Sequence, residues 1–204
     1  MRVSTLSPLL ITCFVGERDH CTVCNSNSKQ TLHHILSNCS SALEQGRYTW
    51  RHDSVLRTIF DFIRSEVKGG YDVFVDLSGH GAGNGGTIPP DVLVTTQRPD
   101  LFIVNRDLKK VILLELTVPW DMNIDSSHGI KSRKYASLIG DLERHFSVEA
   151  YCFEVSVRGL VSKANKARLK SFLMHSHPLH YLRHTLKFSL HPNTNREHKN
   201  SLSK

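Results

Sequence analysis

The chain has 204 residues, of which 39% are hydrophobic and 22% are charged, which is enough for one globular domain and a small additional module. This composition argues against a wholly disordered chain and against a coiled coil, and no apolar run reaches the roughly 20 residues that cross a bilayer. Lysine and arginine total 26 against 19 acidic residues, so the net charge is +7, which favours a polyanionic partner.

Cysteine usage and the N-terminus bear on the cellular compartment. The chain has five cysteines, and Cys21, Cys24 and Cys39 lie close together in the sequence. An odd, clustered set is unusual for a secreted domain held by disulfides, so we expect a reducing, intracellular location and no secretion. Residues 1–20 resemble a signal peptide only faintly, because their apolar stretch is short and contains Pro8. We therefore assign them as a leader that belongs to no domain.

The predicted secondary structure mixes strands and helices. Apolar periodicity and turn residues predict, in chain order, a helix over 50–67, a strand over 71–77, a hairpin with strands over 101–104 and 111–118, a helix over 127–145, a strand over 148–157 and a helix over 163–173. This order favours an α/β domain with a mixed sheet, and an α+β domain is the alternative. Residues 175–204 are basic and rich in histidine, so we expect a poorly ordered tail.

The first motif with chemical meaning is the cluster Cys21-x2-Cys24-x9-His34-x4-Cys39. Structural zinc sites use four sulfur or nitrogen ligands in a tetrahedron, and a Cys-x2-Cys turn supplies two of them. A helical turn before Cys39 would present the other two ligands on one side. His33 is a rival to His34 as the histidine ligand. Because four protein ligands leave no open position, the zinc would be structural rather than catalytic.

The second motif is a pair of carboxylates. Asp100 follows Pro99 at the start of one predicted strand, and Glu115 lies among apolar residues in the next. A carboxylate in an apolar strand is unfavourable unless it is paired or binds a cation. The hairpin would bring both groups together, where they could hold Mg²⁺. The structural alternative is a capping Asp and a Glu on an exposed edge, and a second Pro-Asp, at Asp91, ranks lower because no hairpin strand follows it directly.

Two lysines share the apolar face of the helix predicted over 127–145. Lys131 and Lys134 lie at helical spacing with three core-type residues, Tyr135, Leu138 and Leu142. Lysines seldom lie on such a face unless they snorkel to solvent or pair with an acid. We expect the amine of Lys134 to point at the carboxylate pair, with Lys131 nearer the rim, and a lysine there could stabilise charge that develops on a phosphate.

These motifs belong to a longer ordered series. It comprises the cysteine cluster followed by Gly46–Asp53 (GRYTWRHD), Arg98–Val104 (RPDLFIV), Leu113–Trp120 (LLELTVPW), Lys131–Tyr135 (KSRKY) and Glu154–Gly159 (EVSVRG). The series resembles the C-terminal region of site-specific non-LTR retrotransposons that carry a restriction-like endonuclease. The resemblance extends over residues 21–173, about three quarters of the chain.

The resemblance implies a PD-(D/E)xK nuclease core, a mixed sheet flanked by helices, preceded by a zinc knuckle in which His34 is preferred to His33. It implies that Asp100 and Glu115 bind Mg²⁺ and that these two residues are catalytic together with Lys131 and Lys134. Thr117 stands where the general pattern has its lysine, so the lysine function would come from the helix.

The resemblance also implies an organisation and a setting. We expect a zinc knuckle over 21–45 and an endonuclease domain over 46–174, a nuclear location, DNA as the partner with RNA as a second candidate, and no membrane. DNA contacts are expected from Arg98, Lys131 and Arg133. No reverse transcriptase region precedes the knuckle, so we expect a fragment or remnant of such an element. The alternative is an inactive, zinc-containing nucleic-acid-binding module derived from one.

Overall fold

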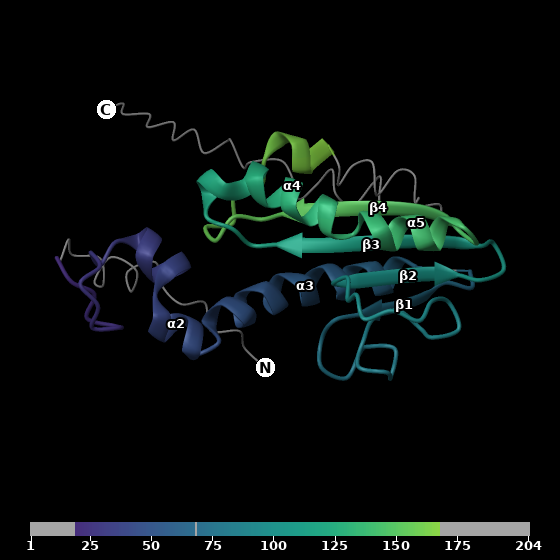
Figure 1. The fold of residues 1–204 in the computed structure, drawn as a ribbon, viewed down its shortest axis with the longest axis horizontal. Coiled ribbons are helices and arrows are strands. Elements are labelled where there is room, and N and C mark those ends of the chain that lie inside the picture. Colours follow the sequence, from purple (N-terminus) through teal and green to yellow (C-terminus); the bar gives the residue numbers. More distant parts are fainter. Residues whose placement is uncertain (1–18, 68, 168–204) are drawn as a thin grey trace, which may run out of the picture.

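The fold is seen in a computed structural model that describes residues 19–67 and 69–167 (Figure 1). Its centre is a four-stranded sheet in the order β1 (Asp72–Val75), β2 (Leu101–Asn105), β3 (Lys110–Thr117) and β4 (Ser147–Glu154). β2 is antiparallel to both β1 and β3, whereas β3 and β4 are parallel. The predicted mixed-sheet α/β fold is therefore confirmed.

The β2–β3 hairpin forms the middle of the sheet. All five residues of β2 and the six central residues of β3 are buried. Helices on both faces account for these continuous apolar runs, because a strand covered on both sides has no solvent face. The pairing sets Leu101 opposite Leu114. As a result, the residue before β2, Asp100, lies beside Glu115 of β3.

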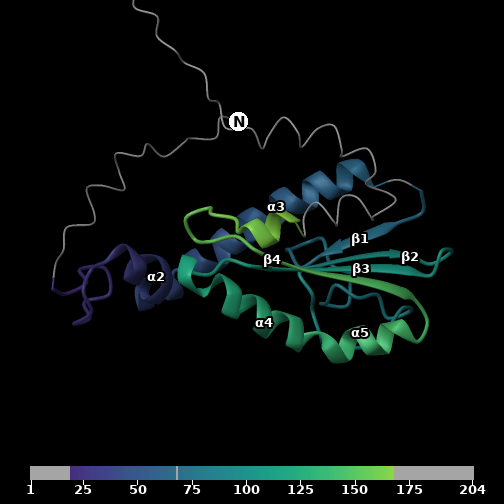
Figure 2. The ribbon, with the colours of Figure 1, turned by 90° about the horizontal axis from the view of Figure 1, so that it is seen from above.

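Helices cover the two faces of the sheet (Figure 2). On one face, α3 (Arg47–Glu66) packs through Leu56, Phe60 and Ile63, which are buried at helical spacing. On the other face lie α4 (Ile124–Lys134) and α5 (Ala136–Glu143), which connect β3 to its parallel neighbour β4. The shorter elements are η1 (His34–Asn38), α2 (Ser40–Glu44) and η2 (Asp121–Asn123).

The prediction of a single helix over 127–145 is wrong. This segment forms two helices, because Tyr135 leaves the helical conformation with φ −99° and ψ 3°. The ring of Tyr135 is buried, and its hydroxyl donates a hydrogen bond of 2.8 Å to the main-chain oxygen of Arg98. A contact with a segment 37 residues away therefore accompanies the break, and apolar periodicity alone does not reveal such a contact.

The other differences concern element ends. The strand predicted over 71–77 is the shorter β1, and the helix predicted from residue 50 begins three residues earlier, at Arg47. Residues 163–167 are helical, and the remainder of the helix predicted over 163–173 lies outside the described residues. Most of the predicted leader and the whole predicted tail lie outside them too.

Candidate metal centre and carboxylate site

Four zinc-type ligands come together near the start of the described chain. The thiol sulfurs of Cys21, Cys24 and Cys39 and a ring nitrogen of His34 all lie within 4.8 Å of one another. Zinc–sulfur bonds directed to the corners of a tetrahedron give sulfur–sulfur distances of about 3.8 Å. Small side-chain movements would therefore close this cluster around one ion. Sulfur and imidazole donors suit zinc, and these four residues could hold a structural zinc ion.

The local backbone explains how the four ligands meet. Asn25, directly after Cys24, has a φ of 52°, a left-handed conformation that asparagine tolerates and that turns the chain sharply. His34 and Cys39 are five residues apart at the two ends of η1, which is a π-helical turn. A π turn closes between residues i and i+5, whereas five residues of an α-helix rotate the chain about 140° beyond one turn. The π turn thus brings His34 and Cys39 to the same side.

Hydrogen bonding and burial affect two of the thiols in opposite directions. The Cys24 sulfur lies 3.1 Å from the Ser26 hydroxyl oxygen and 3.4 Å from His34 Nε2. Hydrogen bonds with Ser26 lower the pKa of the Cys24 thiol to about 5. Burial raises the pKa of the Cys39 thiol. Because zinc binds thiolates, zinc binding at neutral pH would release a proton from Cys39.

The cluster is attached to the first turns of α3. The Tyr48 hydroxyl accepts a hydrogen bond of 2.9 Å from the main-chain N–H of Cys39 and lies 3.3 Å from the carbonyl oxygen of that residue, to which it donates. One turn along, the Arg51 guanidinium donates to the carbonyl oxygen of Leu36 at 3.0 Å. The ligand turn is therefore held by side chains of α3 as well as by its own backbone.

His33, the rival to His34, packs elsewhere. Its ring centre lies 4.7 Å from that of Trp120, and the guanidinium of Arg158 lies 5.4 Å from the centre of the same tryptophan ring. His33 therefore attaches the cluster to the segment that follows β3, and His34 is the histidine in the ligand cluster.

The carboxylate pair is buried at the sheet. Asp100 is 8% exposed and Glu115 is 4% exposed. The main-chain N–H of Asp100 donates to Glu115 Oε2 at 3.3 Å, and the main-chain N–H of Leu116 donates to Asp100 Oδ2 at 2.6 Å. The hairpin backbone thus fixes both side chains. Asp100 Oδ1 makes no hydrogen bond to a residue that the structure describes, and carboxylate oxygens are the ligands that Mg²⁺ prefers.

The two lysines are arranged in the opposite order to the one predicted. Lys131 Nζ donates to Glu115 Oε1, whereas Lys134 Nζ lies 3.7 Å from the same oxygen. The Lys131 side chain is 28% exposed and that of Lys134 is 50% exposed, so Lys134 is the one at the rim. The prediction assumed one continuous helix whose apolar face carries Lys134 inward, but α4 ends at Lys134, and Ile130, one turn before it, is exposed.

His52 is a member of this site that sequence reasoning missed. Its Nε2 lies 3.4 Å from Asp100 Oδ2, and its Nδ1 lies 3.1 Å from Asp53 Oδ1. The hydrogen bond and the charge of Asp100 raise the pKa of His52 to about 9, against the effect of burial. The imidazolium balances Asp100 as the Lys131 ammonium balances Glu115. One signal was available, because His52 precedes the buried Leu56 by one turn on the core-facing stripe of α3.

Tyr135 joins the two sides of the site. Burial, followed by the charge of Glu115, raises the pKa of its phenol above the ordinary value, so the hydroxyl stays protonated and donates to Arg98. Lys134 Nζ in turn donates to the Tyr135 oxygen at 2.7 Å. The tyrosine therefore holds the rim lysine close to the carboxylates.

The residues predicted to contact DNA differ in their surroundings. Lys131 is paired with Glu115, and Arg98 forms an ion pair with Asp76. Arg133 lies on the exposed side of α4. Unlike the other two, Arg133 forms no ion pair with another residue that the structure describes, so its charge is available to a phosphate.

No protein-family model matches the chain, and no curated protein does. Within the part of the chain that the structure describes, no helix combines the length and the apolar character needed to cross a membrane. The fold and the two sites define a mixed-sheet α/β protein with an N-terminal Cys3His cluster and a buried carboxylate pair.

Proposed function

We propose that the chain is a Mg²⁺-dependent DNA endonuclease domain of the PD-(D/E)xK type, derived from a non-LTR retrotransposon and carrying a structural zinc ion. The observation that supports this most strongly is the buried pair of Asp100 and Glu115 with the Lys131 ammonium against it. Hard oxygen ligands beside a fixed cation suit phosphodiester hydrolysis. The net charge of +7 suits a nucleic-acid substrate.

Each group at the site has a defined task in this proposal. Asp100 and Glu115 would hold Mg²⁺, which when bound polarises the phosphate and lowers the pKa of the attacking water. Lys131 compensates the charge of Glu115 and can offer its ammonium to the phosphate as negative charge develops there. Water adds to phosphorus, the P–O3′ bond breaks, and the proton lost by water passes to the leaving oxygen. The products are a 5′-phosphate and the 3′-hydroxyl that a linked reverse transcriptase would extend.

Nicking of supercoiled plasmid by the zinc-loaded protein, with and without Mg²⁺, tests the proposal. We expect Mg²⁺-dependent nicking by the parent and a loss of at least about 100-fold in Asp100→Asn and in Glu115→Gln. Asp91→Asn is the matched control, because Asp91 also follows a proline but is exposed and pairs with Arg106. This control should nick at the parental rate.

Two outcomes would contradict the proposal. A folded, zinc-loaded parent that binds plasmid but does not nick it at any Mg²⁺ concentration would favour the inactive nucleic-acid-binding module. Equal nicking by the parent and by both carboxylate variants would mean that the activity does not depend on this pair.

A further inference from the structure

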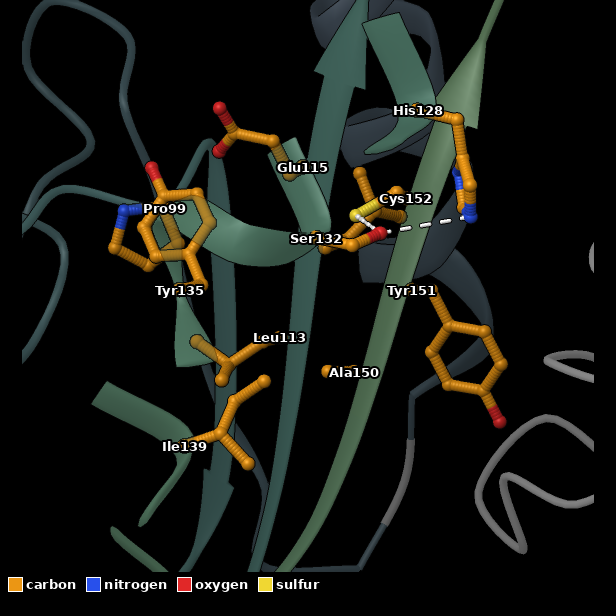
Figure 3. A pocket seen from close by; sticks show the side chains of 11 residues that line it. Pro99, Leu113, Glu115, His128, Ser132, Tyr135, Ile139, Ala150, Tyr151 and Cys152 are labelled. Carbon is orange, nitrogen blue, oxygen red and sulfur yellow. Dashed lines mark hydrogen bonds between the residues drawn. The ribbon is translucent and has the colours of Figure 1, made fainter. Parts of the chain in front are cut away.

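A cavity of about 420 Å³ lies beside the carboxylate site, between α4 and α5 on one side and β3 and β4 on the other (Figure 3). Its volume is in the range of about 300–1,000 Å³ that is typical of ligand pockets. Leu113, Ile139 and Ala150 form an apolar wall. In the view of Figure 3, Glu115 lies on the same side as Tyr135, and three polar residues lie on the opposite side, His128, Ser132 and Cys152.

The polar side of the cavity is held in a fixed orientation. Glu154 is 1% exposed, and its Oε1 lies 2.8 Å from His128 Nδ1. Because a carboxylate oxygen accepts, the Nδ1–H of His128 donates this hydrogen bond, which fixes the orientation of the ring and leaves Nε2 facing Ser132. This Nε2 lies 3.5 Å from the Ser132 hydroxyl oxygen, which lies 3.7 Å from the Cys152 sulfur. An imidazole nitrogen and a hydroxyl group, which can both donate and accept, therefore sit side by side at the cavity wall.

We propose that this cavity binds one unpaired nucleobase of the DNA strand that is cut, an inference that rests on the proposed nuclease function. Apolar walls suit the flat faces of a base, and adjacent donor and acceptor groups suit its hydrogen-bonding edge. Glu115 lines the cavity as well as the carboxylate site, so a base seated here would leave its own phosphate or the next one at the carboxylates. The exposed Arg133 lies on the same helix as His128 and Ser132.

The position of the cavity implies a substrate preference. A space between a helix layer and a sheet admits a base only after the base has left the stack of the duplex. A nucleotide that is already unpaired avoids the cost of extrusion. The protein should therefore bind a duplex with one unpaired nucleotide more tightly than the same duplex fully paired.

The test is equilibrium binding, measured by fluorescence anisotropy in Mg²⁺-free buffer, to two labelled duplexes that differ by one unpaired nucleotide. The parent should prefer the unpaired duplex by about tenfold. Ala150→Phe fills the cavity from the exposed, pocket-facing side of β4 and should bind both duplexes equally. Ala164→Phe, at an exposed alanine that does not line the cavity, should keep the preference. Ser132→Ala, an exposed helical position, should lower it about threefold without affecting folding.

The result that would overturn the inference is a parent with no preference, or a preference that survives in both Ala150→Phe and Ser132→Ala. Because no Mg²⁺ is present, the binding result is separate from nicking. Nicking without a preference would remove the base pocket and leave the nuclease proposal intact. A preference that Ala150→Phe abolishes, in a protein that never nicks, would contradict the nuclease proposal and leave the base pocket intact.

Discussion

Replacement of Lys131 by methionine removes one charge from the carboxylate site and keeps a side chain of similar length. The loss of one partner of a buried ion pair costs about 3–5 kcal/mol, because the other charge is left uncompensated. Two features of this site reduce that value. Lys131 is itself 28% exposed, and Lys134 Nζ, 3.7 Å from the same Glu115 oxygen, can move closer. We therefore expect the free energy of unfolding to fall by about 2 kcal/mol and Tm by about 4–8 °C.

Lys134→Met is the matched control. It removes the same group from the same helix, but the Lys134 side chain is 50% exposed and its ammonium is the more distant of the two. Exposed ion pairs contribute about 0–1 kcal/mol. The control should therefore lose less than about 1 kcal/mol of stability.

Urea denaturation of the zinc-loaded proteins, followed by circular dichroism, measures both changes. The buffer should contain neither Mg²⁺, which could replace the missing charge, nor a chelator, which would remove zinc. Equal losses of stability in the two variants, or a larger loss in Lys134→Met, would refute the assignment of Lys131 as the inner lysine. The same pair should separate in plasmid nicking, with a loss of about 100-fold or more in Lys131→Met and less than about tenfold in Lys134→Met.

Three further predictions concern zinc, protonation and DNA binding. Metal analysis should find about one zinc per chain in the parent and in Cys152→Ser, and none in Cys24→Ser. NMR titration should give His52 a pKa of about 9. Because this value exceeds the unfolded value of about 6.5, the stabilisation of the folded state by protonated His52 should be complete below about pH 6.5 and lost as the pH rises through 9. Asp100→Asn should return the pKa of His52 toward 6.5, and an unchanged pKa would contradict the contact between His52 and Asp100. DNA affinity should fall steeply between low and physiological salt, and an affinity indifferent to salt would point to a different kind of partner.

Much of the central architecture could be predicted because its signals are local. The β2–β3 hairpin is two β-rich runs joined by a short polar turn, and the cysteine cluster contains all of its ligands within nineteen residues. The proximity of Asp100 and Glu115 follows from that hairpin alone. These features need only strand periodicity and ligand spacing, both of which are visible in the chain.

The remaining features depend on contacts between distant segments. The break at Tyr135 accompanies a hydrogen bond to Arg98, 37 residues away, and it reverses the order of the two lysines because it ends the helix on which their predicted order rested. His52 meets Asp100 across 48 residues, once α3 has packed on the sheet. Helical periodicity is enough to put His52 one turn before Leu56 on the inner face of α3, but it does not show which strand end that face meets.

The helix α3 joins the two sites at a fixed spacing. Tyr48 holds the zinc-ligand turn at Cys39, and His52 contacts Asp100. Tyr48 and His52 are four residues apart, which is about 6 Å along the helix axis. The insertion of a single residue between them would rotate His52 by about 100° and separate it from Asp100, although every side chain of both sites would still be present. The distance in sequence between Tyr48 and His52 is therefore as much a requirement of this protein as the identity of either residue.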